Sequence, residues 1–186
     1  YQLTGEKSYL EWADHFYQFC KQMQDPVTKI YYNGVHTLLQ NGHRQAGDVN
    51  KDLYSYNSGS MILADLLLFD ITKDSSYEQD AWQAAHATHE AFLQKNSNGT
   101  REYKDFIWFT AIWAEGFAEL EKRDASRTTE YREVFEEMLT HGIQNCERFD
   151  GLIPHDCARD WRPDEDVYDR LLLTHCANAE MAFLLS

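Results

Sequence analysis

The chain has 186 residues, of which 43% are hydrophobic and 14% aromatic, enough for one domain with a substantial core. Its 17 basic and 31 acidic residues leave a formal net charge of -14, which repels nucleic acid and anionic membrane surfaces. Such a charge suits a neutral or cationic ligand, or simply reflects an acidic surface in contact with solvent. The longest apolar run, 61–69, is interrupted by Asp65 and is too short to span a bilayer.

Helical periodicity and stop signals predict an all-α protein. In chain order, the predicted helices cover residues 6–23, 57–72, 75–94, 103–123, 127–147 and 168–185. Strand signals are nearly absent, so the segments 24–56, 95–102 and 148–167 are expected to be long loops. The connections at 72–76 and 123–127 are short turns, and long and short connections therefore alternate along the chain.

This alternation predicts a layered array of helices. The helix starts near Asn57, Lys104 and Tyr168 are expected at one end of the array, and the short turns at the opposite end. Helices 57–72 and 168–185 are apolar around most of their circumference, as inner helices are.

Helices 75–94 and 127–147 are amphipathic, as an outer layer requires. The expected architecture is a double-layered (α/α)6 toroid, of which this chain forms about half of the ring.

A repeat in the sequence supports helical hairpins as the building unit. The segment 1–9 returns as 69–77, so Tyr1 corresponds to Phe69 with a period of 68 residues. A looser third copy runs from Leu120 to Tyr131. By this correspondence the first residues form the last turn of an inner helix, and we expect the chain to be the C-terminal part (1–186) of a single toroid domain whose N-terminal half is missing.

Other features of the sequence limit the possible cofactors but not the localisation. The four cysteines form no close pair of the zinc or redox kind, so we expect no cofactor and no metal site. The histidines at 86 and 89 match no metal-binding order and are interpreted as a surface patch of an outer helix. The protein is secreted or on the cell surface if an upstream part carries a signal, and otherwise cytoplasmic.

The segment from Tyr54 to Gly59, where a polar loop meets an apolar helix, is the strongest functional signal. Aromatic faces stack on sugar rings, side-chain amides bond to hydroxyls, and a glycine allows a ligand or a neighbouring helix to approach the backbone. The alternative interpretation is a capped helix start whose tyrosines lie on the core.

Three clusters are expected at the end of the array that carries the long loops, because loops on a rigid scaffold carry function. The first joins the segment 31–34 to Tyr54, Tyr56 and Asn57, and the second joins Arg101, Tyr103, Lys104 and Asp105 to Trp108. The third contains Asp156, Asp160, Trp161, Asp164 and Asp166. Aromatic residues interleaved with amides and charges are more typical of a carbohydrate cleft than of a nucleotide site.

Four segments carry a resemblance to a known family: 25–35 (DPVTKIYYNGV), 54–59 (YSYNSG), 103–107 (YKDFI) and 177–181 (ANAEM). In order and spacing they resemble glycoside hydrolase family 76, chiefly endo-α-1,6-mannanases on an (α/α)6 toroid, with fungal cell-wall relatives proposed to act as transglycosylases. The resemblance covers the C-terminal half of the family's domain. It implies α-mannan or mannooligosaccharide as the partner and substrate-binding walls made of Tyr32, Asn33, Tyr54, Tyr56, Asn57, Lys104 and Asp105.

The sequence departs from the family at its catalytic element, an adjacent pair of aspartates on an earlier inner helix. No Asp-Asp dipeptide occurs here, so no catalytic residue is expected in this segment and the segment alone should be inactive. Phe109 stands where the family usually has arginine, and Tyr54 where it usually has tryptophan. Asp65 and Glu180, on inner helices, are expected to pair with Arg or Lys or to bond to backbone.

Two alternatives to an α-mannan glycoside hydrolase remain open. A non-catalytic glycan-binding helical module would bind mannan without cleaving it. A helical-repeat scaffold would instead bind a protein partner through its concave face, and it predicts an apolar or charged groove rather than one lined with tyrosine, tryptophan and amides.

Overall fold

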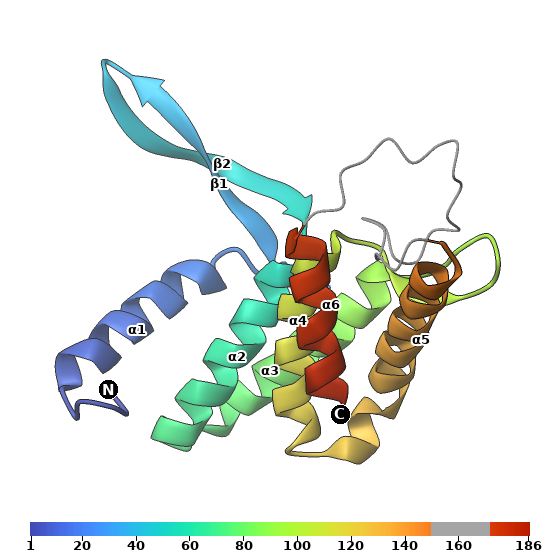
Figure 1. The fold of residues 1–186 in the computed structure, drawn as a ribbon. Helices are drawn as coiled ribbons and strands as arrows, with labels where there is room; N and C mark the ends of the chain where they lie inside the picture. Colours follow the sequence, from blue (N-terminus) through green and yellow to red (C-terminus); the bar gives the residue numbers. More distant parts are fainter. Residues whose placement is uncertain (150–171) are drawn as a thin grey trace.

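The computed structural model describes residues 1–149 and 172–186, and helices dominate this part of the chain (Figure 1). The described helices are α1 (Lys7–Lys21), α2 (Ser55–Thr72), α3 (Ser75–Phe92), α4 (Ile107–Glu121), α5 (Ala125–Phe149) and α6 (Leu172–Leu185). The expected all-α architecture is confirmed. Predicted helix ends agree within two residues except at the start of α4, where a short strand replaces the expected first turn, and at the start of α6, which is described from Leu172.

The helices form two layers. Helices α2, α4 and α6 lie side by side and run in the same direction, with α3 and α5 packed against them (Figure 1). The starts of α2 and α4 lie at one end, and the turns that follow α2 and α4 lie at the opposite end, as the alternation of connections predicts. The most buried side chains fill the space between the layers and include Ile62, Leu66, Trp113, Phe117 and Phe135.

Helices α2 and α4 touch through their backbones at Gly59. A Cβ atom added at this glycine would lie 2.5 Å from the carbonyl oxygen of Ile112 and 2.8 Å from Cα of Trp113. On the other helix, a Cβ at Gly116 would meet the carbonyl oxygen of Gly59 at 3.1 Å. The glycine of the segment 54–59 therefore allows a neighbouring helix, not a ligand, to approach the backbone.

The turns that end two repeat units have the same hydrogen bond. The amide of Lys73 donates to the carbonyl of Phe69 at 2.8 Å, and the amide of Gly5 donates to the carbonyl of Tyr1 at 2.7 Å. Both donor residues have positive φ, 61° and 74° respectively. The predicted correspondence between residues 1–9 and 69–77 is confirmed at this turn. After the second turn, Asp74 caps α3 by accepting from the amide of Ser76 at 2.9 Å.

The expectation of a structureless loop over residues 24–56 was wrong. Strands β1 (Tyr32–Gln40) and β2 (His43–Leu53) pair antiparallel as a hairpin that projects from the helices (Figure 1). Its turn is Asn41-Gly42, with φ of 52° and 77°, which is the dipeptide preferred in two-residue hairpins. Most residues of the two strands are exposed, so apolar and polar residues do not alternate along them. Only the turn dipeptide indicated a hairpin in the sequence.

A second, shorter hairpin occupies the region predicted as the loop 95–102. Strands β3 (Leu93–Lys95) and β4 (Arg101–Tyr103) pair antiparallel between α3 and α4. Because Tyr103 belongs to β4, helix α4 begins at Ile107 instead of at residue 103.

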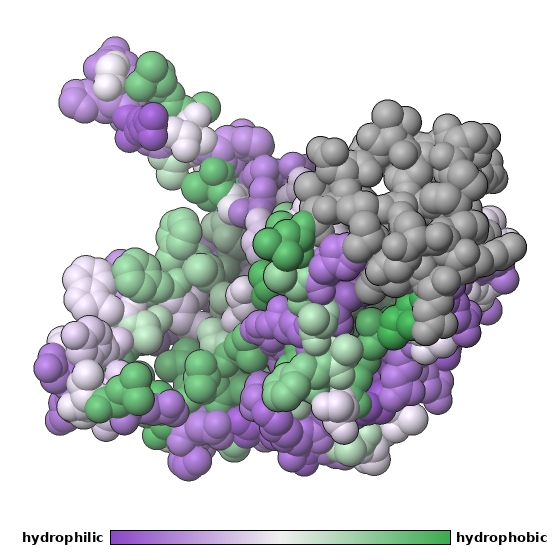
Figure 2. Space-filling view, viewed as in Figure 1, coloured by the Kyte–Doolittle hydropathy of each residue, from purple (hydrophilic) through white to green (hydrophobic). Residues whose placement is uncertain are grey.

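Helix α1 lies at one side of the array and leaves a long apolar groove against α2. The groove encloses about 600 Å³ and is lined by side chains that include Leu10, Phe16, Met61 and Leu67. Hydrophobic surface gathers over this region in Figure 2. None of the helices described in residues 1–149 and 172–186 has the length and apolarity needed to cross a membrane.

Candidate carbohydrate-binding site

The starts of α2 and α4 meet the base of the β1–β2 hairpin at one end of the helical layers. Asp105 joins the two helix starts, because its Oδ2 accepts from the amide of Ser55 at 2.6 Å while its Oδ1 accepts from the amide of Phe106 at 2.8 Å. The amide of Tyr31, just before β1, donates to Oγ of Ser58 at 3.4 Å. These bonds hold three chain segments, distant in sequence, around one surface region.

Three of the predicted sugar-binding residues form a hydrogen-bonded group there. The hydroxyl of Tyr56 donates to Oδ1 of Asn33 at 2.7 Å, and Nδ2 of Asn57 donates to the same oxygen at 3.5 Å. Within the described residues, the Asn33 amide nitrogen and the Asn57 amide oxygen have no hydrogen-bond partner. The two N–H groups of Asn33 and the amide oxygen of Asn57 therefore remain for ligand hydroxyls.

Aromatic rings border this polar group. Tyr54 and Tyr56 are stacked, with ring centroids 5.9 Å apart and an interplanar angle of 20°. Phe109 contacts both tyrosines, at 4.5 Å from Tyr56 and 5.5 Å from Tyr54. All three rings are only partly buried, so they combine mutual packing with an accessible surface. Flat apolar rings beside paired amides suit the alternating C–H faces and hydroxyls of a sugar.

Tyr32 lies at the base of the hairpin but is engaged differently. Its hydroxyl donates to Oδ2 of Asp25 at 2.5 Å, and Nζ of Lys51 lies 5.6 Å from its ring centroid. The bond from Tyr32, together with the backbone amides of Thr28 and Val27, holds the pKa of Asp25 well below its usual range. The same bond raises the pKa of the Tyr32 hydroxyl.

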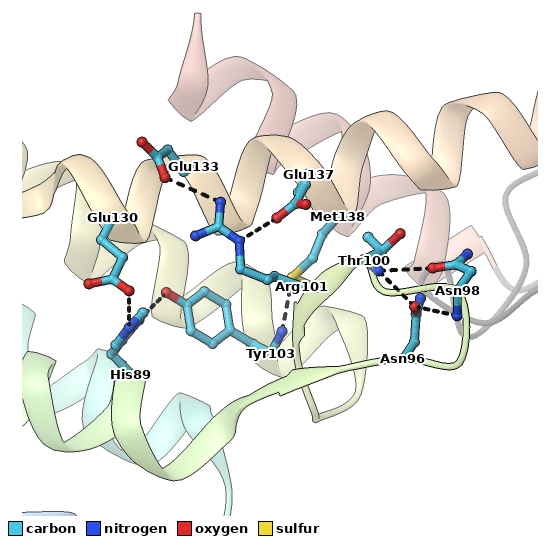
Figure 3. Close-up of polar contacts among 10 residues, drawn as sticks. All are labelled: His89, Asn96, Asn98, Thr100, Arg101, Tyr103, Glu130, Glu133, Glu137 and Met138. Atoms are coloured by element: carbon cyan, nitrogen blue, oxygen red, sulfur yellow. Dashed lines mark hydrogen bonds and ion pairs between the residues drawn. The ribbon is translucent and has the colours of Figure 1, made fainter.

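The structure separates the members of the predicted cluster 101–108. Lys104 is exposed beside the site, whereas both carboxylate oxygens of Asp105 are taken by backbone amides. Arg101 points to α5, where its Nε lies 2.6 Å from Glu137 and its terminal nitrogen 3.2 Å from Glu133 (Figure 3). The expected placement of Arg101 in the cleft cluster was wrong, because carboxylates of a neighbouring helix bind its guanidinium.

Tyr103 is also directed away from the site. It is buried, its amide donates to Sδ of Met138 at 3.1 Å, and its hydroxyl lies 2.9 Å from Nδ1 of His89 (Figure 3). Nε2 of His89 lies 3.6 Å from Glu130 on α5. Burial lowers the pKa of His89 despite this carboxylate.

The interpretation of His89 as part of a surface patch was therefore wrong, although His86 is exposed. The described residues contain no group of three or more histidine, cysteine or acidic side chains that could hold a metal ion.

Two acids on inner helices, the buried Asp65 and the exposed Glu180, have partners that differ from those expected. Tyr17 donates to Oδ1 of Asp65 at 2.6 Å, and burial raises the pKa of Asp65 to about 7. Glu180 shares a hydrogen bond with Glu115 on α4, which raises the pKa of Glu115 to about 7. The expected Arg, Lys or backbone partners were wrong, since a phenol and a second carboxyl group take their place.

The third predicted cluster, Asp156, Asp160, Trp161, Asp164 and Asp166, lies outside the described residues, as does Tyr168. Sequence reasoning noted Phe109 only as a departure from the family and left the phenylalanines of this region out of the predicted binding residues. Phe109 contacts both tyrosines and Phe106 contacts Phe109, although neither was among the predicted binding residues. The signal that pointed to Tyr54 and Tyr56, aromatic residues crowded at a helix start, is repeated in the segment 106–109 and could have identified them.

Comparison with known proteins identifies the family of this chain. The model of glycosyl hydrolase family 76 matches residues 1–184, and the chain belongs to that family. The comparison with curated proteins found no significant match.

Several solved structures have the same fold over the whole of this chain. A family 76 glycoside hydrolase from a bovine Bacteroides thetaiotaomicron strain is 26% identical, with a TM-score of 0.78, and this chain covers 40% of it. A family 76 mannosidase of Bacteroides thetaiotaomicron is 24% identical, with a TM-score of 0.77 and 50% of its chain covered. An α-1,6-mannanase from Salegentibacter sp. is 20% identical, with a TM-score of 0.69 and 54% covered. The chain thus spans about half the length of the proteins it matches.

Proposed function

We propose that this chain belongs to an α-mannan glycoside hydrolase of the endo-α-1,6-mannanase type. In this proposal the 186 residues provide substrate-binding walls, and an adjacent pair of catalytic aspartates lies upstream. The observation that carries the proposal is the group of Asn33, Tyr56 and Asn57, bordered by aromatic rings at the starts of two parallel inner helices in a family 76 chain.

The related structures support a ligand of this kind. An inactive variant of the Salegentibacter α-1,6-mannanase, in which two adjacent aspartates are changed to alanine, has been solved with α-1,6-mannotetraose. That protein is 19% identical to this chain, and this chain covers 53% of it. A retaining glycosidase needs two carboxyl groups about 5 Å apart, and no Asp-Asp dipeptide occurs in these 186 residues.

The predicted binding residues take different parts in this proposal. Tyr54 and Tyr56 offer ring faces to a mannosyl unit, and Asn33 and Asn57 bond to its hydroxyls. Lys104 reaches an outer hydroxyl from its exposed position. Asp105 and Tyr32 position the others, since Asp105 ties α2 to α4 and Tyr32 is anchored to Asp25 at the base of the hairpin.

We also propose that residues 1–186 are the C-terminal part of one toroid domain, and that further helices of that domain cover the groove between α1 and α2. Trp12 and Phe16 support this, because they are stacked on α1 and are 58% and 61% exposed. An apolar surface of this size without a partner promotes aggregation in water. Anilinonaphthalene sulfonate should bind the 186-residue segment strongly and the full-length polypeptide weakly; equal binding would contradict the covered groove.

The activity is tested by reducing-sugar release from α-1,6-mannan. The full-length natural polypeptide should release oligosaccharides of several lengths, as an endo-acting enzyme does, and the 186-residue segment should release none. Activity of the segment that disappears when its own acids are changed would refute the upstream catalytic pair.

The absence of an Asp-Asp dipeptide from these residues favours one alternative, a glycan-binding module without catalysis. The same experiment separates the two. A full-length polypeptide that binds mannooligosaccharide in calorimetry but releases no reducing sugar would be such a module.

A further inference from the structure

Three Asn-Gly dipeptides occur in the sequence, at 33–34, 41–42 and 98–99. Such a pair can react without an enzyme, because glycine has no Cβ to hinder the approach of its backbone nitrogen to the preceding side-chain amide. The reaction also requires that the asparagine side chain is free to rotate. The structure places the three asparagines in different surroundings, and these surroundings decide which one reacts.

The side chains of Asn33 and Asn98 are held by hydrogen bonds. Oδ1 of Asn33 accepts from the hydroxyl of Tyr56 at 2.7 Å. Oδ1 of Asn98 accepts from the amide of Thr100 at 2.9 Å (Figure 3), and its Nδ2 lies 3.5 Å from Nε2 of His141. Each of these amides must break its bonds before its Cγ can meet the nitrogen of the next residue.

Asn41 lies at the exposed tip of the β1–β2 hairpin, which projects away from the helices (Figure 1). Within the described residues, no hydrogen bond holds its side chain. The strand register pairs Gln40 with His43, so both turn residues lie outside the ladder. The amide of Gly42 is not engaged by the ladder either, and both reacting groups are therefore free.

We propose that Asn41 is a site of spontaneous covalent modification, at which the side-chain amide cyclises onto the backbone of Gly42 and ends as aspartate or isoaspartate. The backbone nitrogen of Gly42 loses its proton to hydroxide and forms a bond to Cγ of Asn41. The bond from Cγ to Nδ2 breaks, and Nδ2 leaves as ammonia with a proton taken from water. Water then opens the cyclic imide. Cleavage of the new bond gives aspartate, and cleavage of the original peptide bond gives isoaspartate.

Isoaspartate does not fit this turn. Asn41 and Gly42 have φ of 52° and 77°, and a two-residue turn of this type requires positive φ at both positions to match the twist of the strands. Isoaspartate adds a methylene group to the backbone and changes this geometry. Because a two-stranded hairpin is only marginally stable in water, the modification should open the pairing of Gln40 with His43 at the tip.

Peptide mapping by mass spectrometry tests the site. The full-length polypeptide is incubated at pH 8, and the conversion of amide to acid is followed at each Asn-Gly pair by its gain in mass. In the folded protein, Asn41 should react about fivefold faster than Asn33 and Asn98, or more, which is the factor for breaking one hydrogen bond of about 1 kcal/mol. In concentrated urea, where no side chain is held, the three rates should converge.

Trypsin cleavage after Arg44, an exposed residue of β2 near the turn, tests the opening of the tip. Aged wild-type polypeptide should be cleaved there several times faster than fresh polypeptide. Asn41→Gly removes the amide but keeps a dipeptide that this turn accepts, so its cleavage rate should not change with age. Cleavage after the exposed Arg127, on α5, is the internal control and should not change with age in either protein.

Three results would overturn the inference. Modification of Asn33 or Asn98 in the folded protein as fast as that of Asn41, or no modification of Asn41, would refute the assigned site. Modification of Asn41 with unchanged cleavage after Arg44 would show that the turn accepts the products. Cleavage of Asn41→Gly that accelerates with age as in the wild type would assign the opening to another cause. None of these measurements depends on the binding of mannan, so they are independent of the proposed function.

Discussion

The hydroxyl of Tyr56 donates a 2.7 Å hydrogen bond to the side-chain oxygen of Asn33, and so links the start of α2 to the base of the β1–β2 hairpin. The two residues are 23 positions apart in sequence. This bond fixes the orientation of the Asn33 amide, which leaves its nitrogen as a donor beside the aromatic rings.

Tyr56→Phe should therefore weaken the binding of mannooligosaccharide while the ring remains in place. Loss of one hydrogen bond costs about 1 kcal/mol, or roughly a fivefold loss of affinity, measured by calorimetric titration. Tyr9→Phe, at an exposed tyrosine of α1, is the matched control and should leave affinity unchanged. A Tyr56→Phe variant that binds with wild-type affinity but melts at a lower temperature would mean that the bond serves stability alone.

Gly59→Ala should lower the free energy of unfolding by about 1 to 3 kcal/mol, the usual cost of overpacking. The new methyl group would lie 2.5 Å from the backbone oxygen of Ile112, and a backbone atom cannot move aside as a flexible side chain does. Thermal denaturation should show a melting temperature lower by several degrees. Ser60→Ala, at the exposed neighbouring position, should change stability by less than about 0.5 kcal/mol. Wild-type stability of Gly59→Ala would contradict the close contact between α2 and α4.

Asp65→Asn should remove a dependence of stability on pH. The pKa of Asp65 is raised from 3.8 to about 7 in the folded protein, mainly by burial. The folded state therefore binds a proton that the unfolded state has released, and the stability present below pH 4 is lost as the pH rises towards 7. The upper limit of this loss is on the order of 4 kcal/mol, before relaxation and solvent penetration reduce it.

Urea denaturation at pH 5 and pH 8 measures this effect. The groups that face Asp65 are Tyr17, which donates to it, Lys21, which lowers its pKa, and Asp80, which raises it. The difference in stability between the two pH values should shrink in Asp65→Asn and persist in Asp14→Asn, at an exposed carboxylate of α1. An unchanged pH dependence in the first variant would show that Asp65 is ionised in the folded protein.

Arg101→Gln should destabilise the contact between β4 and α5. Arg101 binds two carboxylates at 2.6 and 3.2 Å, and its side chain is only 27% exposed. We expect the free energy of unfolding to fall by about 1 kcal/mol, which is the upper end of the range for ion pairs near a surface. Lys122→Gln, which removes the exposed pair with Glu119, should have almost no effect. If the two substitutions lower stability equally, the Arg101 ion pairs stabilise the protein no more than an exposed surface pair does.

The helices and their order could be predicted because each helix has its own local signals. Helices α2 and α4 are apolar stretches too long for buried strands, and Asp74 before Ser76 marks the start of α3 by local chemistry. The repeat between residues 1–9 and 69–77 also depends on short-range turns, and the bonds of Gly5 and Lys73 have the same form. In contrast, the β1–β2 hairpin has strands exposed on both faces, so no apolar alternation marks them and only Asn41-Gly42 indicates the turn.

The sequence by itself determined the helical class, the family and the aromatic and amide residues near the start of α2, because these depend on residue types at short spacing. Tertiary structure decided how the side chains are used. It directed Arg101 to α5, gave both oxygens of Asp105 to backbone amides and set Tyr56 against Asn33. Each of these contacts joins residues 23 or more positions apart, apart from the bond of Asp105 to its neighbour Phe106. Such contacts depend on the packing of whole helices and strands, which no local pattern specifies.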